Sequence, residues 1–359
     1  MTTAFPLLRL PHLVLMPILE QMEFMERIAL SIYSKRARMY VRLLKMKCNH
    51  IDLRLEDNRV EMKVFFDNSE ELKVDMDTDR YKVDLRYGND HFFWWPGTLS
   101  PIDYVLSIMD VTHCKSIKQL TFPEVSEYDP KYDALIPLLT KLPKIDEVIV
   151  EDTTSWSFSP ESPLLNVLRI IFPVTSAVTI SGHIQKPNYL REIFKGNFDA
   201  VSVSFYLNND EKFSLNDWKF TNAKTLKLAG PAFEVEDLNR YFKLWMKKKC
   251  NPRLENLVVR TRENVTKDLL LKGLNAVQVP IRTDRSLGVL GSIKQYHSDE
   301  KINWEFDITR ADGRIATISI SNHRLVCFYV SPFRQNQSSF MRRFSSFSSV
   351  YNSCIEHFK

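Results

Sequence analysis

Residues 5–47 read FPLLRLPHLVLMPILEQMEFMERIALSIYSKRARMYVRLLKMK, and this stretch decides the N-terminal fold. Apolar residues recur in it at positions i, i+3, i+4 and i+7, which is the spacing of one face of an α-helix. The pattern therefore predicts three short amphipathic helices in succession. Their apolar faces consist of Leu15, Ile18, Leu19 and Met22, then Met25, Ile28, Ala29 and Ile32, and finally Ala37, Tyr40, Val41 and Leu44.

The segment also carries more apolar residues than its three helical faces use. A unit of fewer than about 50 residues rarely buries enough apolar surface to fold alone. We therefore predict that the surplus forms a docking surface for another polypeptide. The alternative is an ordinary helical start that packs on the rest of the chain. The surplus residues are Phe5, Leu7, Leu8, Leu10, Leu13, Val14, Leu30 and Met39.

The segment resembles an F-box, in the form found in the large nematode F-box families. The resemblance implies binding to the Skp-type linker protein of a cullin–RING ubiquitin ligase and, through that linker, to a cullin. Two residues depart from the family pattern: Pro17 should kink or delay the first helix, and Tyr33 replaces a smaller residue or a cysteine. The linker contacts that the resemblance implies are Phe5, Leu8, Leu10, Pro11, Leu15, Ile18, Leu19, Ile28 and Leu30.

Composition sets limits on the remaining chain. Its 359 residues are 44% hydrophobic and 12% aromatic, which predicts two or three globular or repeat-like units. The five cysteines are scattered without a CxxC pair, so we expect a reducing compartment and no zinc site. We find no leader peptide and no run of about eighteen apolar residues, so we expect a cytoplasmic or nuclear protein without a membrane partner.

The net charge of +5 is unevenly distributed along the chain. Residues 1–47 carry eight Lys/Arg and three acids, and residues 332–359 carry four Lys/Arg and one acid. The body between them therefore has a net charge of −3. A nucleic-acid-binding body would concentrate positive charge on its binding surface, so we expect no nucleic-acid partner.

The body contains an internal repeat of the form apolar-x-x-apolar-x-apolar. Its copies start 20 to 31 residues apart, close to the period of leucine-rich repeats. Strands at this period, with helix-compatible stretches between them, predict parallel strands in an irregular leucine-rich-repeat-like solenoid. The alternative is a mixed α/β domain that matches a permissive pattern by chance. The copies are Ile117/Leu120/Phe122, Ile145/Val148/Val150, Thr175/Val178/Ile180, Phe198/Val201/Val203, Ala223/Leu226/Leu228, Leu254/Leu257/Val259 and Leu274/Val277/Val279.

Two other segments alternate in the manner of antiparallel strands. Residues 59–87 predict three such strands, and residues 300–331 predict three more that cap the end of the solenoid. The aromatic run at residues 91–96 is either an anchor for the first set or a contact patch. Residues 332–359 show no clean period and predict a mobile tail.

A second resemblance covers about residues 190–260. Asn197-Phe198-Asp199, the run FEVEDLNRYFKLW at residues 233–245 and NPRLE at residues 251–255 resemble the F-box-associated type 2 domain. This resemblance implies recognition of a substrate or partner protein. Residues 247–250 read KKKC where the family often has glycine, and the last strand runs into Ser331-Pro332 instead of ending in tryptophan.

Catalytic motifs are missing from the sequence. We find no GxGxxG, phosphate loop, HExxH or GxSxG, and only nine glycines are present. We therefore expect a non-catalytic adaptor without a cofactor. The expected fold class is α/β: a three-helix F-box (1–47), a repeat-like recognition domain (48–331) and a tail (332–359).

The expected function is the substrate-recognition adaptor of a Skp–cullin–F-box ligase that promotes ubiquitin-dependent degradation of an unknown protein. The alternatives are a non-degradative interaction scaffold with a divergent F-box and, less favoured, an enzyme of unknown type. Residues that alternate with the buried strand positions would line the concave face and contact the target. They are Gln119, Thr121, Glu147, Ile149, Glu151, Thr179, Ser202, Ser204, Lys227, Val258, Arg260 and Gln278.

Overall fold

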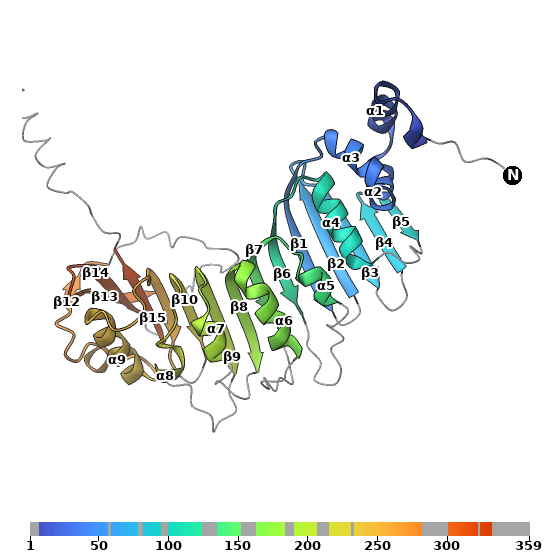
Figure 1. The fold of residues 1–359 in the computed structure, drawn as a ribbon. Coiled ribbons are helices and arrows are strands. Elements are labelled where there is room, and N and C mark those ends of the chain that lie inside the picture. The colour runs from blue at the N-terminus through green and yellow to red at the C-terminus, as the bar shows by residue number, and fades with distance from the viewer. Residues whose placement is uncertain are drawn as a thin grey trace, which may run out of the picture.

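The fold is a mixed α/β arrangement in which helices line one face of a long sheet (Figure 1). The computed structural model describes residues 7–56, 59–77, 82–94, 100–123, 135–151, 163–183, 190–206, 215–230, 233–281, 301–321 and 324–331. Within these residues, fifteen strands join in a single sheet with the order β12-β13-β14-β15-β11-β10-β9-β8-β7-β6-β1-β2-β3-β4-β5. The predicted tail and Phe5 lie outside the described residues.

The N-terminal segment forms the three predicted helices. A 3-10 turn, η1 (Leu7–Arg9), precedes α1 (His12–Gln21), α2 (Phe24–Tyr33) and α3 (Lys35–Leu43). The start of α3 is fixed by Ser34, whose hydroxyl accepts a hydrogen bond from the Ala37 amide at 3.2 Å. Pro17 does not delay the first helix as expected, because α1 begins five residues earlier and continues through it.

An antiparallel meander follows the helices. It consists of β1 (Cys48–Glu56), β2 (Arg59–Phe66), β3 (Glu71–Asp77), β4 (Lys82–Tyr87) and β5 (Asp90–Trp94). The strands predicted over residues 59–87 are confirmed, whereas β1 and β5 were not anticipated as strands. The alternate residues of β2 and β3, such as Val60 and Val74, are fully buried beneath the helices.

Phe24 shows how the helices rest on this meander. It lies on α2 and stacks on Tyr87 of β4 with ring centroids 4.3 Å apart, and it meets Phe66 of β2 at 5.2 Å. Helix α4 (Pro101–Val111) also contacts α2 and α3. The N-terminal helices and the sheet therefore share one hydrophobic core.

Parallel strands continue the sheet in chain order. They are β6 (Ser116–Phe122), β7 (Lys144–Val150), β8 (Thr175–His183), β9 (Ala200–Tyr206), β10 (Thr225–Ala229) and β11 (Asn256–Arg260). The six repeat copies before Leu274 coincide with these strands, and their apolar residues are buried. Strand β1 pairs in parallel with β6, and this pairing joins the meander to the parallel strands.

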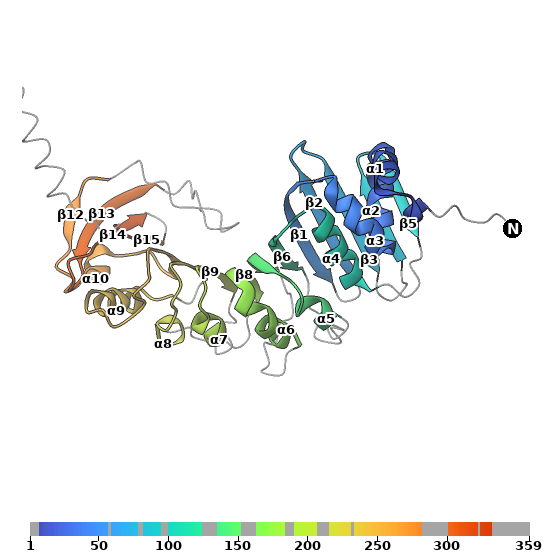
Figure 2. The same cartoon turned by 45° about the horizontal axis from the view of Figure 1, so that its top comes forward.

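Helices between the parallel strands cover the apolar face (Figure 2). They are α5 (Ile136–Leu139), α6 (Pro163–Ile171) with the short turn η3 (Phe172–Val174), α7 (Leu190–Lys195), α8 (Leu215–Trp218) and α9 (Val235–Met246), and α10 (Lys267–Leu270) follows the last parallel strand. The longest is α9, and it buries the predicted stripe of Leu238, Tyr241, Phe242 and Trp245.

The end of the sheet departs from the repeat. The seventh copy was expected to add a parallel strand, but β12 (Val277–Val279) pairs antiparallel with β13 (Ile302–Thr309). The neighbour of β11 is instead the antiparallel strand β15 (Leu325–Val330), reached through β14 (Ile315–Ser321). Val277 is consequently 64% exposed rather than buried.

Aromatic packing explains this exchange of strands. Phe328 of β15 stacks on Phe242 and meets the edge of Trp245, each with ring centroids 5.0 Å apart. A three-residue strand such as β12 has no comparable side chain to place against α9. Burial of the large aromatic surface of Phe328 therefore decides which strand completes the sheet beside β11.

We predict that Trp245→Ala destabilises the protein by about 3–5 kcal/mol, because it removes a fully buried aromatic side chain and leaves a cavity. Chemical denaturation followed by circular dichroism measures the loss. The control is Phe220→Ala, which truncates a side chain that is 57% exposed and should change stability by less than about 0.5 kcal/mol. Equal effects of the two changes would contradict the packing described for α9.

Candidate functional site

The apolar faces of the N-terminal helices point into the protein's own core. Leu15, Leu19 and Ile28 are fully buried there, although each was predicted to contact an external linker protein. Their positions on the helical stripes direct them toward the interior, where they belong to the buried cluster that also contains residues of the sheet and of α4. This corrects the expectation that the whole helical segment needs another polypeptide to bury its apolar residues.

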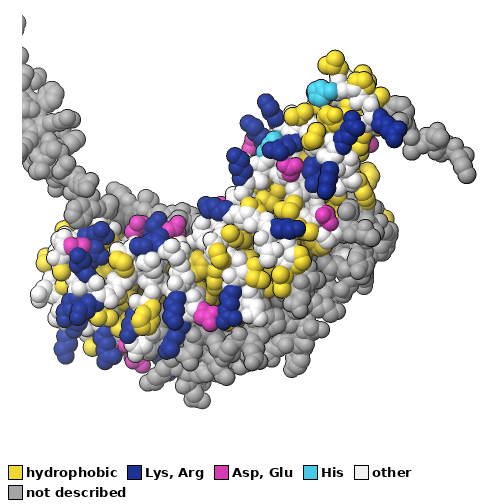
Figure 3. Space-filling view, in the orientation of Figure 1, with side chains coloured by type: hydrophobic (Ala, Val, Ile, Leu, Met, Phe, Trp, Pro, Cys, Tyr) yellow, Lys and Arg dark blue, Asp and Glu magenta, His cyan; other side chains and the backbone are white. Residues whose placement is uncertain are grey.

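The surplus apolar residues behave differently from the stripes. On α1, Leu13 is 84% exposed and Val14 is 48% exposed, and on α3 Met39 is 63% exposed. Pro11 is exposed as well, and Leu8, Leu10, Ile18 and Leu30 are half-buried. Figure 3 shows hydrophobic side chains gathered over this helical end of the molecule, with Lys and Arg beside them. Exposed apolar side chains that gather at one end of a molecule are typical of interaction surfaces.

Hydrogen bonds to helix ends hold this apolar surface in place. The Arg27 guanidinium donates to the carbonyl oxygens of Glu20 at 2.7 Å and Met22 at 2.9 Å, at the C-terminal end of α1. Arg38 of α3 donates to the Ser31 carbonyl of α2 at 3.1 Å. These hydrogen bonds therefore hold together the three helices, of which α1 carries Leu13 and Val14 and α3 carries Met39.

The second candidate site lies on the opposite face of the sheet, which we call the helix-free face. Strand register aligns the target-binding candidates in rows across this face. Thr121 lies opposite Ile149, Thr179 opposite Ser202, and Lys227 opposite Val258. Gln278 is an exception, because it pairs with Phe306, which belongs to the apolar row that faces the helices. The prediction that Gln278 lies on the target-binding face is therefore wrong.

Burial divides these candidates into two groups. Thr121, Glu147, Ile149 and Ser202 are buried, so they do not present a free surface to a partner. Glu147, only 1% exposed, accepts a hydrogen bond from the Thr179 hydroxyl at 2.7 Å. Arg260 is exposed, and six others are half-buried: Gln119, Glu151, Thr179, Ser204, Lys227 and Val258.

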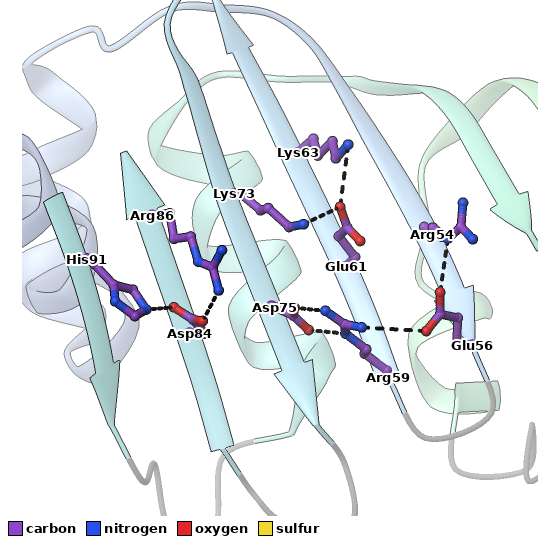
Figure 4. A network of polar contacts seen from close by, with 10 residues as sticks. All are labelled: Arg54, Glu56, Arg59, Glu61, Lys63, Lys73, Asp75, Asp84, Arg86 and His91. Atoms are coloured by element: carbon purple, nitrogen blue, oxygen red, sulfur yellow. Dashed lines mark hydrogen bonds and ion pairs between the residues drawn. The ribbon is translucent and has the colours of Figure 1, made fainter. Parts of the chain in front are cut away.

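Charged residues extend the helix-free face across the meander (Figure 4). Strand pairing places acids in one row and bases in the adjacent row. Like charges directly opposite each other are unfavourable, but diagonal neighbours of opposite sign offset this. The acidic row contains Glu61, Asp75 and Asp84, and the basic row contains Lys63, Lys73, Arg86 and His91.

Contacts with bases, some diagonal across strands and some two residues along the same strand, lower the pKa of these carboxylates. Lys73 and Lys63 lie 3.0 and 3.4 Å from the Glu61 carboxylate. Partial burial opposes ionisation of Glu61, but the hydrogen bonds and charges of the two lysines outweigh it and lower its pKa. Asp84 behaves in the same way, since burial raises its pKa but the contacts with Arg86 and His91 lower it by more. This charged network was not anticipated, although the alternation of charges at i and i+2 along each strand would have indicated it.

A polar bridge connects the N-terminal ends of three neighbouring parallel strands. Arg253, before β11, reaches across β10 and donates to Asp199, before β9, at 2.7 Å. Lys224, before β10, lies 3.0 Å from the same carboxylate. Its hydrogen bond lowers the pKa of Asp199, partial burial opposes this, and Arg253 adds to the lowering. The two separate motifs that suggested the second resemblance, Asn-Phe-Asp and Asn-Pro-Arg, thus meet in space.

Comparison with known protein families finds two matches. Residues 7–49 match the model described as the F-box domain, and residues 189–259 match the model described as F-box associated. These matches confirm both domains, and neither bears on the source organism. No curated protein and no solved structure matches the chain.

Each match coincides with one part of the fold. The F-box extends from η1 to the start of β1, and the associated domain extends from α7 to β11 with the Arg253 bridge inside it. The two domains together are typical of non-catalytic substrate-recognition subunits of Skp–cullin–F-box ubiquitin ligases.

Within the described residues, no helix has the length and apolar character that a bilayer crossing requires.

We predict that Asp199→Asn lowers stability at neutral pH, because it removes the negative charge of the bridge. The loss should be only about 0.5–1 kcal/mol, since the bridge is partly exposed. The folded-state pKa of Asp199 is lowered, so its contribution is present above the unfolded pKa and is lost as the pH falls through the folded pKa. Thermal unfolding from about pH 7 to about pH 3 should therefore show the two proteins converging. A constant difference over that range would contradict the bridge.

Proposed function

We propose that this chain is the substrate-recognition subunit of a Skp–cullin–F-box ubiquitin ligase. The N-terminal helices dock on a Skp-type linker protein, and the sheet holds a target protein for ubiquitylation and degradation. The observation that carries this proposal is the exposed apolar surface of Leu13, Val14 and Met39 on a matched F-box domain. Burial of such a surface against a partner is the main source of affinity in protein interfaces.

The linker-binding surface differs in detail from the one implied by resemblance. Of the implied contacts, Pro11 is exposed, Leu8, Leu10, Ile18 and Leu30 are half-buried, and Leu15, Leu19 and Ile28 serve the core. We propose that the accessible and half-buried residues of this set form the linker contacts together with Leu13, Val14 and Met39. They are Leu8, Leu10, Pro11, Ile18 and Leu30. A rigid support from the shared core would reduce the conformational entropy lost on docking.

For the body, we propose an irregular leucine-rich-repeat-like solenoid formed by β6 to β11 and the helices between them. The support is the parallel, in-register pairing of these strands in chain order and the helices on one face of the sheet (Figure 2). The target would bind the helix-free face through its accessible residues, above all Arg260, Lys227 and Thr179. In such a complex the chain acts by raising the local concentration of the target near the ligase.

A non-degradative scaffold with a divergent F-box is the second candidate. Its support is the pair of departures from the family pattern, Pro17 within α1 and the half-exposed Tyr33 at the end of α2. Affinity purification with mass spectrometry, with and without proteasome inhibition, separates the two functions. A ligase subunit should recover the linker, a cullin and a target that accumulates under inhibition, whereas a scaffold should recover a partner of constant abundance.

The double change Leu13→Asp/Val14→Asp should reduce co-purification of the linker protein at least about tenfold. Two carboxylates in an apolar interface lose their hydration without compensation. Quantitative pull-down measures the loss, and thermal unfolding confirms that the core is intact, since both residues are exposed. The matched control is Phe220→Asp, an exposed aromatic residue at the end of α8 that lies outside the F-box. Undiminished recovery of the linker would contradict the proposed docking surface.

Charge reversal tests the target-binding face. We expect Lys227→Glu/Arg260→Glu to remove the target from purified complexes while leaving recovery of the linker unchanged. The matched control is Lys195→Glu, an exposed residue on α7 at the opposite, helix-covered face. If the control variant loses the target and the double variant retains it, the helix-covered face is the binding surface instead.

A further inference from the structure

A pair of thiols occupies the junction between the F-box and the sheet. Cys48 begins β1 directly after the F-box helices, and Cys114 lies between α4 and β6. The fold brings them together although 65 residues separate them in the sequence, since the Cys48 amide is hydrogen-bonded to Thr112, two residues before Cys114. Both thiols are half-buried, so small solutes can approach them.

The backbone brings these two cysteines together. The Cys48 amide donates to the Thr112 carbonyl at 3.4 Å, and the parallel pairing of β1 with β6 begins a few residues further along both segments. Cys114 is fixed by its amide, which donates to the Met109 carbonyl at 3.0 Å. Its Sγ lies 3.1 Å from the Ser116 carbonyl oxygen. Neighbouring backbone segments of this kind can bring two cysteines within the distance that a disulfide spans.

The surrounding contacts make this junction a seam between two units. Arg42, in the last turn of α3, forms an ion pair with Asp110 of α4 at 3.2 Å. The His113 ring, which follows α4, hydrogen-bonds the Arg42 carbonyl oxygen at 2.8 Å. Non-covalent contacts therefore already fasten the end of the F-box to the turn that carries Cys114.

We propose that Cys48 and Cys114 form a reversible dithiol–disulfide site, oxidised by peroxide, that locks the F-box to the sheet. The Cys114 thiolate attacks one oxygen of hydrogen peroxide, the O–O bond breaks, and hydroxide leaves from a Cys114 sulfenic acid. The Cys48 thiol then attacks the Cys114 sulfur, so that the S–S bond forms and the S–O bond breaks. The hydroxyl group takes the Cys48 proton and leaves as water, and the proton that Cys114 released on becoming a thiolate neutralises the hydroxide, so that two thiols and one peroxide have become a disulfide and two waters.

The two thiols are unequal in a way that suits these roles. A hydrogen bond from Cys48 lowers the pKa of the Cys114 thiol, and burial opposes this effect. The same hydrogen bond, together with burial, raises the pKa of the Cys48 thiol. Cys114 is therefore the better nucleophile toward peroxide, and Cys48 is the resolving thiol.

Peptide mapping of the full chain tests the site. The reduced protein is treated with a few equivalents of hydrogen peroxide, its remaining thiols are alkylated, and digests are analysed by mass spectrometry. We expect a Cys48–Cys114 linked peptide, an intact mass lower by about 2 Da, and reversal by dithiothreitol. Cys48→Ser should abolish the link and leave a Cys114 sulfenic acid that dimedone traps. The matched control Cys327→Ser, at a buried cysteine elsewhere in the sheet, should leave the link intact.

The outcomes are distinct. Separate oxidation of the two cysteines, a link to another cysteine, or resistance to peroxide at both positions would overturn the proposal. Thermal unfolding provides a second measurement, in which oxidation should raise Tm by on the order of 5 °C in the wild type and not in Cys48→Ser or Cys114→Ser. An unchanged Tm with a mapped disulfide would refute the locking of the seam.

A consequence for ligase geometry rests on the proposed function. The linker should bind the oxidised chain as well as the reduced one, because Leu13 and Val14 lie on α1, away from the seam that α3 and α4 form. Pull-down of the linker with both forms measures this. Loss of binding in both forms would reject the proposed function while leaving the mapped disulfide untouched.

Discussion

One apolar layer, enclosed between the helices and a single face of the sheet, supports the remaining structure. Each strand contributes alternate residues to this layer, and each helix covers the strands beside it. The pairing of β1 with β6 makes the layer continuous, because it joins the antiparallel meander under the F-box helices to the parallel strands of the body. The F-box helices therefore share one hydrophobic core with the domain that follows them.

This continuity changes how the F-box helices work. Leu15, Leu19 and Ile28 on these stripes are buried in the core, so the surplus residues and the half-buried Ile18 remain for the proposed partner. A docking surface that rests on a folded core is already ordered before binding and loses less conformational freedom on association. In the proposed complex, the shared core would also fix the direction of the docked linker relative to the sheet, as the proposed positioning of a target requires.

The helix-free face is polar but not uniform. Over the meander it is a network of ion pairs that satisfies its own charges, such as Glu61 with Lys63 and Lys73. Over the parallel strands its side chains are mostly short hydroxyls and buried groups, with Arg260 open at the far side. The charges of the meander compensate one another in ion pairs, whereas the side chains that solvent reaches on the parallel strands are mixed in character, such as Thr179, Lys227 and Arg260. We therefore place the proposed recognition surface on the parallel strands.

The sequence by itself determined the local elements: three helices from 3.6-residue spacing, six parallel strands from the repeat, and two antiparallel sets from alternation. These patterns depend only on residues close together along the chain, so the helices and strands could be predicted from the sequence. The tertiary structure decided what lies far apart in sequence, including the burial of Leu15 in the shared core, the place of β15 beside β11, and the Arg253–Asp199 bridge. Such contacts depend on which segment buries more apolar surface at a given position. Beside β11, the strand that carries Phe328 is favoured over the strand that carries Val277, because an aromatic ring buries more apolar area against α9.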